Sequence, residues 1–261
     1  MRVLVTGSSG QLGKTIEELY LNNDEGIEFV FTSKSRLDIT DINSIQNIFE
    51  TEQFDYCINC AAYTDVEQAE KTPKIAFRVN AEAVKNLAKA CKKSNTVLIH
   101  ISTDYVFDGE KEGGYTPEDL PNPINEYGKS KLLGEQYIQE VLERYFIIRT
   151  SWLYSKKYGN NFYKTILKKA KTETKLSIID SQKGCPTDTE NLARYVIELI
   201  KNNTQNYSVY HFSDKVIMTW YGFTLLILKE NNMLNKIELV KVNNYVTFAK
   251  RPKNSVLLKK I

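Results

Sequence analysis

The first thirteen residues constrain the fold of this chain more than any other segment. An apolar run from Arg2 to Thr6 is followed by Gly7, Gly10 and Gly13, and then by a stretch with helical periodicity. Gly7 permits a tight exit from a strand, Gly10 lets a pyrophosphate approach the backbone, and Gly13 allows close packing of helix on sheet. The free N–H groups at the start of the helix would face the anion. This order of elements predicts a dinucleotide site, although a glycine triplet is also compatible with a plain turn.

After the glycine turn, apolar runs alternate with helical patterns as far as residue 150. Such alternation is typical of a parallel sheet with crossover helices. We therefore expect an α/β fold in which residues 1–150 form a dinucleotide-binding domain, a doubly wound parallel sheet of the Rossmann type. The predicted strands are residues 2–6, 27–32, 55–59, 96–101 and 145–150, and the predicted helices are residues 11–22, 41–52, 73–93 and a segment that begins near 126.

The alternation weakens beyond Trp152. We expect residues 151–261 to form mainly a smaller, substrate-binding lobe that covers the C-terminal edge of the sheet, with some segments returning to the first domain. The predicted helices of this part are residues 161–171, 188–201 and 219–232, and the predicted short strands are residues 176–179 and 209–212.

The charge balance argues against some classes of partner. The chain carries 35 basic and 32 acidic residues without a long run of one sign, so no nucleic-acid surface is expected. No apolar run approaches about 18 residues, and no signal peptide precedes the first strand, so we expect no membrane partner and a cytoplasmic location.

Neither the cysteines nor the histidines predict a metal site. Cys57 and Cys60 have the spacing of metal ligands, but no second pair occurs and both belong to a run that we expect to be a buried strand. The chain has only two histidines. We expect neither a metal nor a disulfide framework.

Tyr127 and Lys131 form a candidate catalytic pair, because residues four apart share one face of a helix. A nearby ammonium would lower the phenol pKa from its ordinary value of about 10 and prepare the phenol for acid catalysis. About one or two such spacings arise by chance in a chain with sixteen tyrosines. Thr103, whose hydroxyl follows a predicted strand, supports a catalytic role for the pair. Together the three residues predict reduction of a ketone by a nicotinamide hydride.

The end of the second strand indicates which nicotinamide cofactor binds. A carboxylate there would pair with the ribose hydroxyls of NADH. Ser33, Lys34 and Arg36 are instead hydroxyl-bearing or basic and suit a 2′-phosphate. This favours NADPH, with NADH as the alternative, because loop cations are often merely solvated. Asp38 could border the adenine or close the local turn.

Several further motifs extend over nearly the whole chain. They are residues 59–64 (NCAAYT), 77–81 (FRVNA), 102–107 (STDYVF), 149–154 (RTSWLY), 159–162 (GNNF), 182–187 (QKGCPT), 219–221 (TWY) and 251–255 (RPKNS). With the glycine turn and the Tyr127/Lys131 pair, the chain resembles the dTDP-4-dehydrorhamnose reductases of the extended short-chain dehydrogenase/reductase superfamily. It departs from them at Cys60, where alanine is usual, and at residues 248–250, where a proline-bearing approach is usual.

The resemblance implies reduction of dTDP-4-dehydro-L-rhamnose at C4, which yields dTDP-L-rhamnose for cell-surface polysaccharides. Tyr127 would protonate the C4 oxygen, and Thr103 would hydrogen-bond the same oxygen. Lys131 would lower the pKa of Tyr127 and bind the nicotinamide ribose. The cofactor positions expected from the residues and the resemblance are Gly7, Gly10, Gln11, Leu12, Gly13, Ser33, Arg36, Asp38, Ile39, Ala61, Ala62, Tyr63, Thr64, Asn80, Tyr127 and Lys131. The expected substrate positions are Thr103, Asp104, Tyr105, Trp152, Asn161 and Arg251.

Other interpretations stay open at this point. Trp152 could be core packing, Asn161 a helix cap alone, and Thr103 a strand-end cap. Arg251 could bind the substrate diphosphate. The chain could act on another nucleotide sugar as a reductase or epimerase, or bind nucleotide as a silent regulatory subunit. A homodimer is one expected assembly, since dimers are common in the family.

Overall fold

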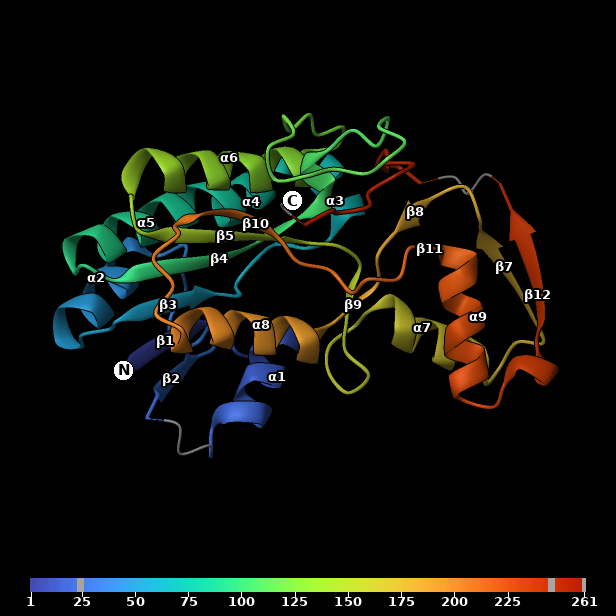
Figure 1. Cartoon of the computed structure of the whole chain (residues 1–261), viewed down its shortest axis with the longest axis horizontal. Helices are drawn as coiled ribbons and strands as arrows, with labels where there is room; N and C mark the ends of the chain where they lie inside the picture. Colours follow the sequence, from blue (N-terminus) through green and yellow to red (C-terminus); the bar gives the residue numbers. More distant parts are fainter. Residues whose placement is uncertain (23–25, 244–246, 260–261) are drawn as a thin grey trace.

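A parallel sheet of six strands organises the computed structural model, which describes residues 1–22, 26–243 and 247–259 (Figure 1). The strand order is β10-β5-β4-β3-β1-β2, and every neighbouring pair is parallel. The strands are β1 (Arg2–Thr6), β2 (Glu28–Thr32), β3 (Tyr56–Asn59), β4 (Val97–Thr103), β5 (Tyr145–Thr150) and β10 (Ser208–His211).

Helices cover both faces of this sheet (Figure 1). On one face lie α1 (Gln11–Tyr20) and α8 (Thr189–Lys201), and on the other lie α2 (Ile42–Thr51), α5 (Ala83–Lys93) and α6 (Glu126–Val141). Strands that are covered on both sides are apolar throughout, which explains why every residue of β3 is buried. The doubly wound Rossmann-type class expected from the sequence is confirmed.

The segment predicted as one helix over residues 73–93 has an irregular middle. It consists of α4 (Pro73–Phe77), a π-helical turn over Arg78–Glu82, and α5. The sequence did not predict the short helix α3 (Val66–Lys71) that precedes it. Wide turns of this kind are frequent at functional sites, and this one contains Asn80.

A second hydrophobic core lies beyond the carboxyl ends of the sheet strands (Figure 1). It is built from α7 (Phe162–Lys169), α9 (Trp220–Glu230) and the parallel pair β7 (Lys175–Ile179) and β12 (Glu238–Val242). The remaining short elements are a 3-10 turn (Asp104–Val106), β6 (Leu153–Tyr154), β8 (Lys183–Gly184), β9 (Thr187–Asp188), β11 (Met218–Thr219) and a 3-10 turn (Leu234–Lys236).

Two elements from the second part of the chain lie with the sheet. β10 pairs with β5 at the sheet edge, and α8 packs on α1 with Leu192 and Val196 fully buried. An unpaired edge strand exposes backbone polar groups, and an uncovered sheet face exposes apolar side chains. The chain therefore returns to the sheet after the first part of the lobe. None of the described helices has the length and apolarity required to span a bilayer.

The sheet edge carries a buried histidine that should make stability depend on pH. His211 Nδ1 donates to the carbonyl oxygens of Tyr115 and Leu258, at 3.0 and 3.1 Å. Burial, assisted by Arg149, lowers its pKa to about 4. The unfolded chain binds this proton near pH 6.5, so the stabilisation is complete above that pH and is lost as the pH falls towards 4.

We expect the free energy of unfolding, measured by urea titration, to fall between about pH 6.5 and pH 4. The variant His211→Asn keeps an N–H donor but does not titrate, so its slope over this range should be shallower. An unchanged slope would assign the pH dependence to other groups.

Candidate functional site

The glycine turn lies where the connections of the sheet diverge. β1 and β3 are neighbours, and their crossovers run to opposite faces, which is where open α/β sheets bind ligands. Gly7 has φ +64°, and a Cβ there would stand 2.6 Å from the backbone nitrogen of Ala61. A Cβ on Gly13 would stand 2.5 Å from Ser8 Cα, and Gly10 caps α1 without a side-chain hydrogen bond. The turn thus has the form of a pyrophosphate cradle, so the chain fits a dinucleotide.

Asn80 holds the loop that follows β3, which contains Ala61, Ala62, Tyr63 and Thr64. Its Oδ1 accepts from the Tyr63 amide at 2.8 Å, and its Nδ2 donates to the Tyr63 carbonyl at 2.9 Å and to Ser130 Oγ at 3.0 Å. These bonds use both hydrogens of the amide. The structure therefore places Asn80 as a support for the loop rather than as a group free to contact a cofactor.

The end of β2 presents Ser33 and Arg36. The Arg36 side chain is 55% exposed, and the two contacts of its guanidinium are long, 3.4 Å to the Phe31 carbonyl and 3.8 Å to Glu52. Asp38 accepts from the amide and hydroxyl of Thr40, so its carboxylate closes the turn. Ile39 is buried in the core between the sheet and α2. The side chains of Arg36 and Lys34 are both more than half exposed, so two cations are available at this strand end.

Thr103 and Tyr127 meet where β4 ends and α6 begins. Asn125 caps α6 by accepting from the Gly128 amide at 2.7 Å, which places Tyr127 in the first turn. The Tyr127 ring packs edge-on against the Tyr105 ring, with centroids 5.9 Å apart. Burial raises the pKa of Tyr127, and a hydrogen bond with Thr103 opposes this rise. The phenol therefore carries its proton at neutral pH and can act as an acid.

Lys131 is buried one turn further along α6. Its Nζ lies 2.7 Å from the Ile101 carbonyl oxygen and 3.2 Å from His100 Nε2. Burial lowers the pKa of Lys131 to about 8. In this structure burial dominates the Tyr127 pKa and shifts it upward, and the expected lowering by the Lys131 cation stays a prediction.

A buried carboxylate adjoins Thr103. Asp104 accepts from Thr103 Oγ1 and from Ser151 Oγ, both at 3.1 Å, and burial raises its pKa to about 6. Thr103 Oγ1 also accepts from the Tyr105 amide. Thr103 is therefore a strand-end cap and at the same time a neighbour of Tyr127. Sequence reasoning did not find Ser151, although it belongs to the motif 149–154.

Arg251 reaches this region from the C-terminal segment. Its Nη2 forms an ion pair with Glu67 at 2.8 Å, and its Nη1 donates to the Tyr105 hydroxyl at 3.4 Å. Within the described residues its buried Nε has no partner. Glu67 also accepts from the amides of Phe248 and Ala249. Sequence reasoning missed Glu67 because it lies in the unpredicted helix α3.

Trp152 has an unusual backbone. Its φ of +48° is rare for a bulky residue, and its ring stacks on Trp220 with centroids 3.5 Å apart and planes 5° apart. A Cβ on Gly184 would stand 2.4 Å from the Trp152 ring. Such strain persists where the surrounding packing imposes it, often at ligand sites. The ring belongs to the periphery of the second core, as the packing interpretation expected.

Gln11 links the glycine turn to the small lobe. Its Nε2 donates to the Leu153 carbonyl, and its Oε1 accepts from Asn161 Nδ2, both at 3.1 Å. Asn161 also caps α7 by accepting from the Lys164 amide. Asn161 is thus more than a cap, and it couples the lobe to the start of α1.

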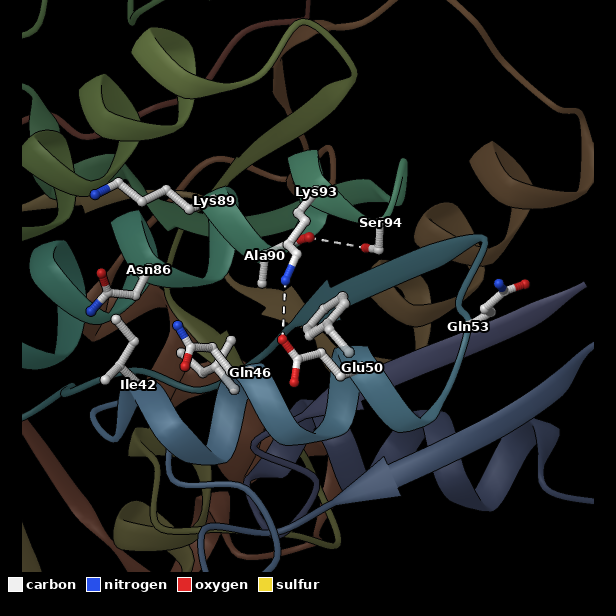
Figure 2. Close-up of a pocket in the computed structure, with 11 residues that line it drawn as sticks. Ile42, Gln46, Glu50, Gln53, Asn86, Lys89, Ala90, Lys93 and Ser94 are labelled. Atoms are coloured by element: carbon white, nitrogen blue, oxygen red, sulfur yellow. Dashed lines mark hydrogen bonds and ion pairs between the residues drawn. The ribbon is translucent and has the colours of Figure 1, made fainter.

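A separate groove of about 410 Å³ opens between α2 and α5, as Figure 2 shows. It is lined by Ile42, Gln46 and Phe49 on one side and by Asn86 and Lys89 on the other. No predicted site residue lines this groove, so it is distinct from the site described above.

Comparison with known proteins places the whole chain in one family. Residues 1–261 match the family model described as the RmlD substrate binding domain. A dTDP-4-dehydrorhamnose reductase of Aggregatibacter actinomycetemcomitans is 38% identical over 98% of this chain and 90% of that protein. The Bacillus subtilis spore coat polysaccharide biosynthesis protein SpsK is 37% identical over 98% of this chain and 88% of that protein. The crystal structure of the Bacillus anthracis dTDP-4-dehydrorhamnose reductase in complex with NADP gives a TM-score of 0.94 at 39% identity, covering 99% of this chain and 90% of that one.

Proposed function

Since the chain belongs to the dTDP-4-dehydrorhamnose reductase family of NAD(P)H-dependent oxidoreductases, we propose that it reduces the C4 keto group of a nucleotide-activated 6-deoxysugar. The proposed substrate is dTDP-4-dehydro-L-rhamnose, and the proposed product is dTDP-L-rhamnose. The observation that carries the proposal is the placement of the Tyr127 phenol beside Thr103, at the carboxyl end of the same sheet that bears the glycine turn.

The residues of the site divide the work of this reaction. When bound, the reduced nicotinamide supplies the hydride for C4. Tyr127 donates its proton to the oxygen on C4, so that the carbonyl becomes an alcohol. The Thr103 hydroxyl turns its hydrogen from Asp104 to the same oxygen and orients it by this hydrogen bond.

The other predicted site residues bind either the cofactor or the sugar nucleotide. The turn of Gly7, Gly10 and Gly13 receives the cofactor pyrophosphate, and Ser33 with Arg36 receives the 2′-phosphate. Asp104 and Trp152 border the sugar. Arg251 binds the substrate diphosphate through the donors that Glu67 leaves unused, including the Nε that has no partner in the described part of the chain.

The turnover experiment uses purified protein, NADPH and dTDP-4-dehydro-L-rhamnose generated by a coupled epimerase. We expect oxidation of NADPH, followed by absorbance, that depends on the sugar nucleotide. A panel of dTDP-, UDP-, GDP- and CDP-4-keto sugars tests the specificity. Lack of oxidation with every member, or tight retention of NAD⁺ with epimerase activity, would reject the proposal.

Arg36→Ala tests the choice of cofactor. We expect the affinity for NADPH to fall about tenfold or more, with little change for NADH, because one charge-assisted hydrogen bond to the 2′-phosphate is lost. Dissociation constants from calorimetry measure both effects. Lys93→Ala, which removes an exposed cation paired with Glu50 far from the turn, is the control. Equal weakening for both cofactors would exclude a contact between Arg36 and the 2′-phosphate.

A further inference from the structure

A line of hydrogen bonds crosses the carboxyl ends of three adjacent strands and ends at Lys131. Thr6 on β1 is in register with Asn59 on β3, and Asn59 is in register with His100 on β4. Thr6 Oγ1 donates to Asn59 Oδ1 at 2.6 Å, Asn59 Nδ2 lies 3.0 Å from His100 Nδ1, and His100 Nε2 lies 3.2 Å from Lys131 Nζ. All four side chains are buried.

The backbone decides the direction of this line. The amide of Ala61 lies 3.2 Å from Asn59 Oδ1, and a backbone N–H can only donate. The oxygen of the Asn59 side chain is therefore the atom that faces Ala61 and Thr6, and its Nδ2 faces His100. Because Nδ2 can only donate, His100 Nδ1 must accept and carries no proton.

The protonation of His100 limits that of Lys131. An imidazole that accepts at Nδ1 carries its proton on Nε2, and this N–H points at Lys131 Nζ. An ammonium has three donors and no acceptor, so it cannot receive this bond. A neutral amine can receive it, while donating one of its own hydrogens to the Ile101 carbonyl oxygen at 2.7 Å.

We propose that His100 positions Lys131 as a neutral amine in the free enzyme, and that Lys131 takes up a proton when the dinucleotide binds. The role in the reaction rests on the proposed function, but the state of the free enzyme does not. The negative charge of the incoming cofactor favours the ammonium. An ammonium loses its bond from His100, which frees Nζ for the ligand. His100 is thus a positioning residue that acts through Lys131.

The charges around Lys131 are compatible with this arrangement. Burial lowers the Lys131 pKa to about 8, and Glu135 on α6 and Cys60 after β3 oppose this effect. Glu135 is itself paired with Arg149 at 2.7 Å. Burial keeps the His100 pKa well below its ordinary value, so the imidazole stays neutral. The bond received from His100 stabilises the neutral amine further.

The tautomer of His100 is the first test, and it needs neither cofactor nor substrate. The chain has two histidines, so ¹⁵N-histidine labelling of the free protein gives two resolvable rings, and the His100→Gln variant assigns them. We expect His100 to carry its proton on Nε2 across neutral pH. A His100 ring protonated on Nδ1 would overturn the proposal.

Proton uptake on NADPH binding is the second test. Calorimetry in buffers of different ionisation enthalpy should show uptake that approaches about one proton per site near about pH 8.5. Lys131→Met should abolish this uptake. His100→Gln should reduce it strongly, because its amide oxygen can accept from an ammonium and let Lys131 be charged before binding.

Uptake that persists in Lys131→Met, or that is the same in His100→Gln and the parent protein, would contradict the proposal. Thermal unfolding shows whether both variants fold. If one does not, the tautomer of His100 in the parent protein decides whether the proposal holds. A protein that passes these tests but reduces no sugar nucleotide would disprove the proposed substrate and leave this inference standing.

Discussion

Replacing Tyr127 with phenylalanine should lower the turnover number by at least ~10²-fold and leave NADPH affinity within about twofold. The change removes only the hydroxyl, so the ring still packs edge-on against Tyr105. The lost group is the protonated acid beside Thr103. Without it, the C4 oxygen loses the proton donor that the proposal assigns to it. Steady-state kinetics with the sugar nucleotide and calorimetry with NADPH measure the two quantities.

Tyr137→Phe is the matched control for this prediction. It makes the same chemical change on the same helix, and the Tyr137 hydroxyl bonds to Glu82 rather than to any site residue. Its turnover should equal that of the parent protein. Full activity in the Tyr127 variant would remove this phenol from the mechanism, and equal losses in both variants would point to damage to α6 instead.

Replacing Glu135 with alanine should lower the free energy of unfolding by about 3–5 kcal/mol, because it leaves a buried cation without its partner. Glu135 and Arg149 are 1% and 5% exposed and lie 2.7 Å apart. Glu135 also accepts from the Ser102 hydroxyl, and within the described residues Arg149 Nη1 already lacks a partner. The pair joins α6 to β5 beside the site. Urea unfolding of the two proteins measures the difference.

Two comparisons separate this effect from loss of charge in general. Glu238→Ala breaks an exposed pair with Lys175, in which both side chains are more than half exposed, and should cost no more than about 1 kcal/mol. Replacing both Glu135 and Arg149 with methionine should recover much of the loss, since no charge is then left buried. A single variant that unfolds like the exposed control would show that water screens the pair.

The order of strands and helices in residues 1–150 could be predicted because each is a local property of the chain. The strands are continuous apolar runs, Asp41 caps α2 at the predicted start of that helix by accepting from the Asn43 amide, and Gly7 occupies a turn that excludes any Cβ. The placement of α8 and β10 could not be predicted in the same way. Their patterns define a helix and a strand, but only the exposed face and edge of the sheet decide where they pack.

The same distinction between local patterns and tertiary packing applies to the candidate site. The residue types and spacings of Thr103, Tyr127 and Lys131 indicated ketone reduction, because a hydroxyl at a strand end and a phenol and an amine on one helical face are local relations. The sequence by itself thus determined the family, the class of fold and the kind of chemistry. Only the tertiary structure decided the electrostatics, since burial acts through distant segments. Burial raises the Tyr127 pKa. The packing of distant segments places Lys131 Nζ beside His100 and brings Glu67 to Arg251.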